Sequence, residues 1–199
     1  MHKRVRHHAM QFIFLLVCGM VLNGCAQANS TGPRAPTQQT GEDVQVTAQA
    51  KVDKRQFKLA REIASETWIN SEKINWDELR GQVVLIDFWT FACYNCKNTL
   101  PYKKAWDEKY RARGLVVLGV HTPELSFEKD VENVRKAVQG YNIKYPVAID
   151  GDFANWNRYN VRAWPTWFIV DKEGYIRYTH VGEGDYDGSE RVIQQLLAE

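Results

Sequence analysis

The sequence predicts an α/β fold in which helices cover both faces of a mixed central β-sheet. Two apolar runs, 83–89 and 115–120, are nearly continuous rather than alternating, which is typical of strands buried on both faces. A segment of helical character follows each run. Near the C-terminus, "TWFIVDKEGYIRYTHV" (166–181) indicates a hairpin with its turn at 172–174. Strands that alternate with helices and then form a hairpin are expected to share one layered domain.

The first long helix is expected to start at the motif "CYNC", directly after the strand at 83–89. Gly114 is a suitable stop for it, because glycine readily adopts the left-handed conformation that ends helices. The helix is therefore expected to reach about Arg113. Pro101 falls inside it and is expected to kink it.

A second helix is expected at 126–140, after the strand at 115–120. Its apolar residues recur at helical spacing. Ser126 can cap its start and Gly140 its end. The residues of this stripe are Phe127, Val131, Val134 and Val138.

Shorter elements complete the domain. A helix around 57–64 and a strand pair that turns near Asn70 are expected before the first buried strand. "YPVAID" (145–150) indicates a short strand and "FANWNRYN" (153–160) a short helix. Asp187 with Glu190 has the spacing of a capping box, so the last helix is expected to begin there.

The N-terminal segment has the form of an export signal. Three basic residues precede an apolar core at 9–22, which is too short to span a bilayer comfortably. "LNGC" (22–25) then resembles the bacterial lipobox, in which the cysteine is lipidated after cleavage. The domain limits expected from this are a signal peptide at 1–24, a lipidated Cys25 with a flexible tether at 25–55, and the folded domain at 56–199. An uncleaved anchor or a plain secretory peptide is the alternative.

Charge and cysteine content exclude several classes of protein. The chain has 26 Lys+Arg and 24 Asp+Glu, and removal of Lys3, Arg4 and Arg6 with the signal leaves 23 against 24, a net charge of −1. Nothing therefore indicates a nucleic-acid surface. Of the four cysteines, only two remain as thiols if Cys25 is acylated and the signal is lost. A four-cysteine zinc site and a disulfide-rich scaffold are excluded, and an exported CxxC pair favours redox work.

A resemblance to a known family supports this interpretation. From about residue 67 to the C-terminus the chain resembles the thioredoxin superfamily, which implies a thioredoxin-like sandwich. The phrase "GVHTPE" (119–124) and the additional helix before "YPVAID" are similar to the TlpA-like branch, most of all to the C-terminal domain of DipZ-type cytochrome c biogenesis proteins. The residues at the family's signature positions are Asp87, Cys93, Cys96, Pro101, Pro165 and Gly182.

The two cysteines have the spacing of a working dithiol. Residues i and i+3 of a helix face the same way, so Cys93 and Cys96 can close a small disulfide. Unpaired N–H groups at a helix N-terminus stabilise a thiolate there. We therefore expect Cys93 to be the exposed nucleophile and Cys96 the buried resolving thiol. An inert pair, or half of an intermolecular zinc site, is the alternative.

Asp87 is the only charge in its buried strand. Burial without a partner should raise the pKa of this carboxyl group. The resemblance implies that Asp87 lies beneath the cysteines, where it can take the proton of Cys96. The alternative is an aspartate at a strand end that reaches solvent or caps a turn.

Four further residues are expected to bind the partner protein. The resemblance implies that the Trp164–Pro165 bond is cis and faces the dithiol, which leaves the Trp164 backbone free to pair with an extended segment. Thr166 begins the next strand, and Gly182 in "HVGEG" should flank the same cleft. From sequence alone, an ordinary trans proline at a sheet edge is the alternative.

His121 and Glu124 follow the strand at 115–120, and loops at strand C-termini gather beside such sites. They could tune Cys93 or contact a partner. Solvated loop residues are the favoured alternative.

The function expected is that of a membrane-anchored extracytoplasmic thiol:disulfide oxidoreductase, facing the periplasm or the cell exterior. It should reduce protein disulfides, such as those of apocytochromes, with the Cys93–Cys96 pair as its redox group and no cofactor or metal. The resemblance implies a membrane electron donor of the DsbD/CcdA type, and Cys25 implies contact with lipid. A Sco-like copper protein, with His121 or His180 as third ligand, is one alternative, and a thiol peroxidase is another.

Overall fold

The computed structural model describes residues 56–199. The predicted signal peptide at 1–24, the lipidation of Cys25 and the tether at 25–55 lie outside the described residues and stay predictions. No helix in the described part of the chain is long and apolar enough to cross a membrane.

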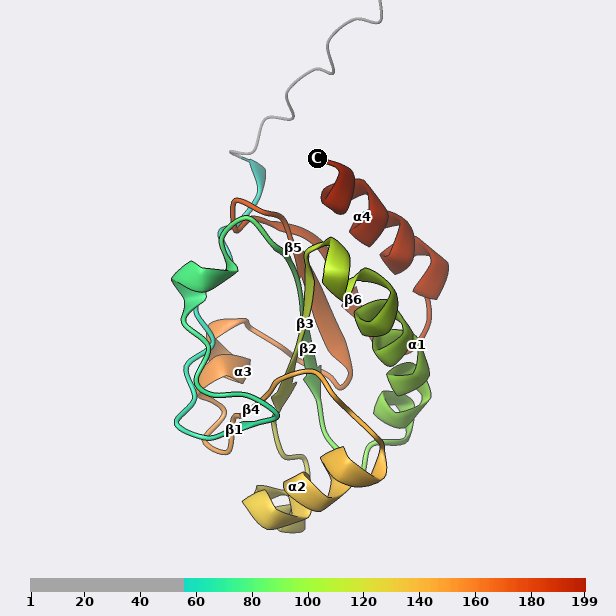
Figure 1. The fold of residues 1–199 in the computed structure, drawn as a ribbon. Helices are drawn as coiled ribbons and strands as arrows, with labels where there is room; N and C mark the ends of the chain where they lie inside the picture. The colour runs from blue at the N-terminus through green and yellow to red at the C-terminus, as the bar shows by residue number, and fades with distance from the viewer. Residues whose placement is uncertain (1–55) are drawn as a thin grey trace, which may run out of the picture. The chain divides into compact units, whose positions relative to one another are not determined.

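A six-stranded sheet with the order β1-β4-β3-β2-β5-β6 forms the centre of the domain (Figure 1). β2 runs parallel to β3 and antiparallel to β5, so the sheet is mixed, as expected. Its strands are β1 (Trp68–Ile69), β2 (Val83–Trp89), β3 (Leu115–His121), β4 (Val147–Ile149), β5 (Thr166–Val170) and β6 (Ile176–Val181).

β2 is central, and all seven of its residues are buried. Alternate side chains of a strand point to opposite faces of the sheet. Leu85 and Trp89 therefore enter one apolar cluster, and Ile86 and Phe88 enter another. Asp87 lies between Leu85 and Trp89 in this alternation, so its carboxyl group points to the first face.

Helices cover both faces of the sheet, which confirms the predicted fold class (Figure 1). The first cluster contains residues of α1 (Tyr94–Tyr110), α2 (Val131–Gly140) and α4 (Tyr186–Ala198). The second cluster is covered by α3 (Ala154–Arg158), by the 3-10 helix η2 (Trp76–Leu79) and by residues that precede β1.

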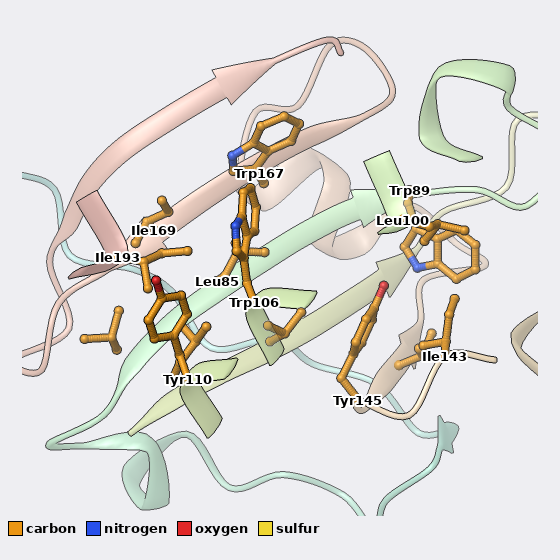
Figure 2. Packing of buried hydrophobic residues seen from close by; sticks show 14 of the residues in the cluster. Leu85, Trp89, Leu100, Trp106, Tyr110, Ile143, Tyr145, Trp167, Ile169 and Ile193 are labelled. Carbon is orange, nitrogen blue, oxygen red and sulfur yellow. The ribbon is translucent and has the colours of Figure 1, made fainter. Parts of the chain in front are cut away.

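Aromatic side chains fill much of the first cluster (Figure 2). Trp89 and Trp167 have no exposed surface, and Trp106 is 2% exposed. Trp106 from α1 and Trp167 from β5 therefore join helix to sheet directly. Such rings bury a large apolar area each, which makes this face of the sheet the main source of hydrophobic stabilisation.

Three predicted elements differ from those observed: two lie before β2, and the third is the second helix. Residues 57–64 form no helix; Leu59 instead makes an isolated bridge to Tyr175. Asn70 does turn the chain, with φ 68°, but β1 pairs with the distant β4 rather than with a neighbouring strand. The helix expected at 126–140 is a 3-10 turn, η4 (Ser126–Lys129), followed by α2, because the side chain of Asp130 accepts the Glu132 N–H and restarts the helix.

The ends of α1 and α4 were predicted with unequal success. α1 passes into the 3-10 helix η3 (Arg111–Arg113) and stops at Gly114, which has φ 97°, as predicted. The prediction of a capping box at Asp187 is wrong. The residue that caps α4 is Asp185, in a left-handed conformation and without a side-chain capping bond, so the helix starts earlier.

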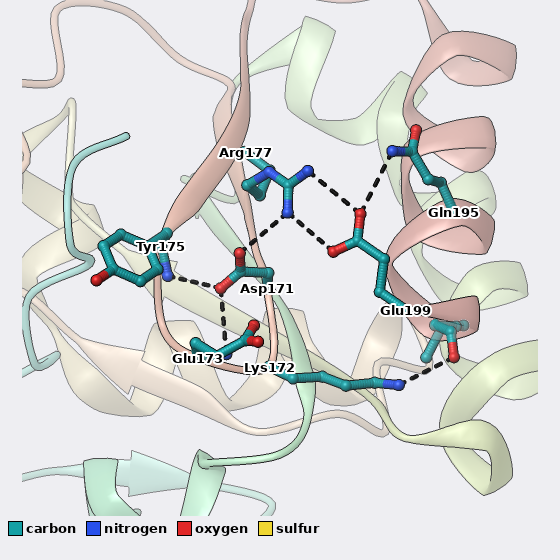
Figure 3. Close-up of polar contacts among 8 residues, drawn as sticks. Asp171, Lys172, Glu173, Tyr175, Arg177, Gln195 and Glu199 are labelled. Carbon is teal, nitrogen blue, oxygen red and sulfur yellow. Dashed lines mark hydrogen bonds and ion pairs between the residues drawn. The ribbon is translucent and has the colours of Figure 1, made fainter. Parts of the chain in front are cut away.

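A charged network fixes α4 to the β5–β6 hairpin at the end of the sheet where β2 begins (Figure 3). The Asp171 carboxylate accepts the N–H groups of Glu173 and Tyr175 and pairs with Arg177 at 3.1 Å. Arg177 also donates to both carboxylate oxygens of Glu199, at 2.9 and 3.2 Å. The C-terminal residue is thus held to the sheet by a saturated set of bonds.

Candidate active site

The predicted site residues meet at the other end of the sheet. Trp89, the last residue of β2, lies level with His121 at the end of β3. β5 runs the opposite way, so its first residue, Thr166, lies opposite Phe88. Three segments therefore meet at one end of the sheet: the chain that leads to Cys93, the loop after β3 and the segment around Pro165.

Cys93 is the N-cap residue of α1 and is partly exposed. Its Sγ accepts the backbone N–H of Cys96 at 3.1 Å. A hydrogen bond from the Cys96 thiol, assisted by backbone N–H groups, outweighs partial burial and lowers the pKa of Cys93 to about 7. The first cysteine can therefore be a thiolate at neutral pH while it remains accessible.

Cys96 lies one turn further along α1 and is fully buried. Burial raises the pKa of its thiol strongly, and the hydrogen bond to Cys93 and the negative charge of Asp87 act in the same direction. Both sulfurs are present as free thiols. The pair is thus asymmetric, with an ionisable outer thiol and a protonated inner one.

Asp87 has a partner that the sequence analysis missed. Lys103 of α1 pairs with its Oδ1 at 2.5 Å, and both side chains are almost completely buried. The prediction of an unpartnered carboxyl group was therefore wrong. Burial nevertheless raises the pKa of Asp87, because desolvation outweighs the opposing effect of Lys103. The second oxygen, Oδ2, has no hydrogen-bond partner among the described residues.

Two more buried polar atoms lie on the same face of the sheet as Asp87. Gly119 pairs with Asp87 in the parallel register. A Cβ at Gly119 would lie 3.0 Å from Trp89 Nε1 and 3.4 Å from the ring of Tyr145, so these two rings are neighbours (Figure 2). Neither Trp89 Nε1 nor the Tyr145 hydroxyl has a partner in the described part of the chain. The surroundings of Asp87 are therefore polar but incompletely bonded.

The segment expected to bind the partner has the predicted backbone. The Trp164–Pro165 bond is cis, and the Pro165 carbonyl accepts the N–H of Gly182 at 2.8 Å. The Trp164 indole donates to the Thr122 carbonyl at 3.0 Å, which ties this segment to the loop after β3. Thr166 is buried and donates to a backbone carbonyl, so its hydroxyl supports the turn rather than facing solvent.

His121 is the last residue of β3 and is fully buried, so its interpretation as a solvated loop residue was wrong. Its ring stacks on Phe91 at 5.6 Å, and its Nε2 lies 3.3 Å from the Thr90 hydroxyl. Burial lowers the pKa of His121 to about 4, so the imidazole is neutral at physiological pH. Glu124 is exposed in the following loop, as the solvated interpretation expected.

Glu128 is a second residue of this site that sequence analysis missed. Its side chain is buried and accepts four hydrogen bonds. Oε1 accepts the Thr90 hydroxyl at 2.5 Å and the Ala92 N–H at 2.8 Å. Oε2 accepts the N–H groups of Glu124 and Leu125 at 2.9 and 2.8 Å. Burial acts to raise the pKa of Glu128, but the four hydrogen bonds outweigh it. The pKa therefore lies below its usual value, and the carboxylate is ionised.

The geometry does not support the copper alternative. His121 is held between Thr90 and Phe91, and His180 packs against Trp167 at 4.3 Å. Within residues 56–199, no group of three or more His, Cys, Asp or Glu side chains could hold a metal ion.

Comparison with known proteins agrees with this geometry. The model of the AhpC/TSA family matches residues 55–179, more than half of the chain. The chain belongs to the AhpC/TSA family. Its six-stranded mixed sheet and CxxC-headed helix are the thioredoxin-like form of that family.

Individual relatives narrow the assignment. Protein DipZ of Mycobacterium bovis is 43% identical over 133 residues, which is 65% of this chain and 19% of DipZ, so the chain spans about a fifth of that relative. Thiol-disulfide oxidoreductase ResA of Bacillus cereus is 27% identical over 146 residues, 72% of this chain and 82% of ResA. A thiol-disulfide isomerase from Corynebacterium glutamicum shares the fold with a TM-score of 0.67, at 23% identity over 73% of this chain and 99% of that one. These matches relate this AhpC/TSA member to thioredoxin-like proteins, and one of the relatives, ResA, is named a thiol-disulfide oxidoreductase.

Proposed function

We propose that this AhpC/TSA-family protein reduces disulfides of partner proteins outside the cytoplasm through Cys93 and Cys96. The observation that carries the proposal is the asymmetry of the pair. Cys93 is partly exposed at a helix cap with a pKa of about 7, while Cys96 is buried behind it with a raised pKa. One sulfur is thus ready to attack, and the other is protected until it is needed.

The first step is attack by the Cys93 thiolate on a disulfide sulfur of the partner. A bond forms between Cys93 and that sulfur, and the partner's disulfide bond breaks, which releases one partner thiolate. The second step is resolution. Cys96 loses its proton and attacks the Cys93 sulfur, which closes the Cys93–Cys96 disulfide and releases the second partner thiolate. The partner gains two electrons, and the dithiol loses two.

Asp87 is the proposed acceptor of the Cys96 proton. Its negative charge acts on the Cys96 thiol, and its Oδ2 is without a partner among the described residues. A carboxylate whose pKa is raised by burial is a stronger base than one in water. Lys103 keeps the carboxylate ionised by charge pairing, so that it can accept the proton.

The modest acidity of Cys93 supports the reducing direction. A thiolate that is strongly stabilised favours the reduced form and makes the pair oxidising, as in DsbA, where the pKa is about 3.5. A pKa of about 7 is close to that of thioredoxin, which is a reductant. We therefore propose that the oxidised pair is regenerated by a membrane electron donor of the DsbD/CcdA type.

The partner is proposed to bind as an extended segment beside Trp164 and Pro165, with Thr166 and Gly182 shaping that edge. Apocytochrome disulfides are the proposed substrate class, on the resemblance to DipZ-type proteins. Glu124, exposed beside the cysteines, is the proposed polar contact.

The proposed location is a membrane surface that faces the periplasm or the cell exterior, with the chain anchored through lipid on Cys25. The lipobox resemblance supports this location. Leu59, near the start of the described residues, contacts Tyr175 at the end of the sheet remote from the cysteines. Attachment through the N-terminal side is therefore compatible with a dithiol that is open to partners.

Mutants of the two cysteines test the function. In the full chain, Cys96→Ala should accumulate a mixed disulfide through Cys93 when incubated with an oxidised protein such as insulin, and Cys93→Ser should accumulate none. Wild type should turn over insulin, with a potential nearer the ~−270 mV of thioredoxin than the ~−120 mV of DsbA. Turnover that survives Cys93→Ser, or consumption of hydroperoxide in place of disulfide, would contradict the proposal.

A further inference from the structure

The turn that carries Cys93 is held from one side by a single segment of the chain. Three residues, Thr90, Phe91 and Ala92, lie between the end of β2 and Cys93, and each contacts the segment 121–141. Thr90 bonds to Glu128, and Ala92 donates its N–H to the same carboxylate. Phe91 stacks on His121, and its carbonyl accepts the Tyr141 hydroxyl at 3.0 Å.

Glu128 is the charged centre of this contact. We propose that Glu128 is a positioning residue for Cys93: its buried carboxylate fixes the turn before the nucleophile against the loop that follows β3. The inference rests on the proposed function, because it concerns the reactivity of the same thiol. It adds a residue that lies 35 positions from Cys93 in the sequence and 41 from Asp87.

A purely structural role explains only half of this carboxylate. A glutamate in the first turn of a helix often reaches back to the N–H at the helix start. Oε2 does this at the start of η4, where it accepts the N–H groups of Glu124 and Leu125. Oε1 points away from η4, to Thr90 and Ala92. Capping of η4 does not require these two bonds. Their donors, Thr90 and Ala92, lie in the turn directly before Cys93.

The charge of Glu128 is required by its donors. All four groups around the carboxylate donate, and three of them are backbone N–H groups that no side-chain rotation can redirect. An amide in its place would direct an NH₂ group at two donors, whichever way it is turned. Glu128→Gln therefore preserves shape and volume but breaks the contact with either the Cys93 turn or the loop.

The consequence reaches Cys93 through the backbone. The Cys93 thiolate is stabilised first by the hydrogen bond from the Cys96 thiol and then by N-cap geometry, with Sγ 3.1 Å from the Cys96 backbone N. If Ala92 loses its acceptor, the residue before Cys93 is held less firmly, although Lys97 still donates to the Cys93 carbonyl. The position of Sγ against its donors then loosens, and the stabilisation of the thiolate weakens. The pKa of Cys93 should then rise from about 7 towards the usual range of a free thiol.

The test is the pH dependence of Cys93 alkylation in the reduced full chain. Iodoacetamide labelling is followed by fragment-ion mass spectrometry, which assigns the label to Cys93 within the peptide that carries both Cys93 and Cys96. Glu128→Gln should move the midpoint from about 7 to about 8 and slow labelling at pH 7 about fivefold. Glu132→Gln is the matched control, since this glutamate is exposed on α2 and its midpoint should stay at the wild-type value.

Thermal unfolding of the same variants separates the two roles. A Glu128→Gln protein that melts earlier but keeps the wild-type Cys93 midpoint would show that Glu128 is only structural and would overturn the inference. If Glu128→Gln does not fold, Thr90→Val tests the inference instead, because it removes one of the four donors to Glu128. It should raise the midpoint of Cys93 labelling by a smaller amount. An unchanged midpoint counts against the inference. Alkylation needs no partner protein. A wild-type protein that fails to reduce insulin would therefore contradict the proposed function but leave the test of Glu128 intact.

Discussion

Asp87 and Asp171 each form a buried ion pair with a basic residue, but the two pairs are bonded differently. Asp171 accepts two backbone N–H groups as well as Arg177, and Arg177 also binds Glu199. Asp87 accepts only Lys103, and its Oδ2 has no hydrogen-bond partner in the described residues.

We propose that the difference reflects different roles for the two pairs. Buried polar groups in proteins are normally hydrogen-bonded, because an unsatisfied one costs about 1–3 kcal/mol. The pair at Asp171 follows this rule and fixes the C-terminal helix to the hairpin. The pair at Asp87 breaks it beneath the dithiol, where a free carboxylate oxygen can receive a proton. The first pair is structural, and the second is proposed to be functional.

The largest expected effect separates the two aspartates by kinetics. Asp87→Asn cannot accept a proton, so resolution of the mixed disulfide at pH 7 should slow by about 100-fold or more. Asp171→Asn should leave this rate unchanged and lower the free energy of unfolding by about 3 kcal/mol, because it breaks a buried pair. Stopped-flow measurement of partner release, with urea unfolding of both variants, checks the prediction. Equal slowing by both would erase the distinction.

The basic partners should differ in the same way. Lys103→Met removes the charge that opposes desolvation, so the pKa of Asp87 should rise further. The pH at which resolution is half-maximal should then rise by about one unit. Arg177→Met should leave that pH unchanged while lowering stability. The pH profile of single-turnover resolution measures this, and an unshifted profile in Lys103→Met would show that Lys103 does not act on Asp87.

A smaller effect is expected on stability: His121, at the dithiol end of the sheet, should make the free energy of unfolding depend on acid pH. The pKa of His121 is about 4 in the folded protein and near 6.5 when unfolded, so the unfolded state gains its proton first as the pH falls. The stability that the neutral imidazole provides is present above pH 6.5 and is lost towards pH 4, in total about 3 kcal/mol. His121→Gln should remove this part of the pH dependence. Urea unfolding of wild type and variant at pH 7 and pH 4.5 measures it, and parallel losses in both proteins would contradict the assignment.

Local patterns predicted the elements that carry the chemistry. The apolar runs at 83–89 and 115–120 became β2 and β3, because a strand buried on both faces needs no alternation. The position of Cys93 at a helix start followed from the CxxC motif and the strand before it. Gly114 ended the first helix as predicted, since its backbone needs positive φ.

The missed residues depend on contacts between elements. Lys103 meets Asp87 only because α1 packs on the face of β2 to which Asp87 points. Its signal was present, because it falls in the buried stripe of α1 with Leu100 and Tyr110, where a lysine requires a partner. Glu128 gave no such signal, since its four donors come from two loops whose approach the sequence does not reveal.

The short elements failed for a similar reason. β1 has two residues, and its pairing with β4 brings together positions nearly eighty residues apart. Local sequence cannot choose that partner over a neighbouring hairpin. His121 was placed in a loop because β3 extends one residue beyond the predicted strand, which turns its ring into the core.

The most direct test of the central claim is a titration of both thiols in the reduced wild-type protein. Labelling of each cysteine with iodoacetamide is measured from pH 5 to pH 10, and fragment-ion mass spectrometry assigns the label to Cys93 or to Cys96. The account predicts that Cys93 reacts with a midpoint near pH 7 and that Cys96 stays unlabelled across the range. A Cys93 midpoint at about 8.5, the value of an ordinary thiol, or equal labelling of the two cysteines, would contradict it.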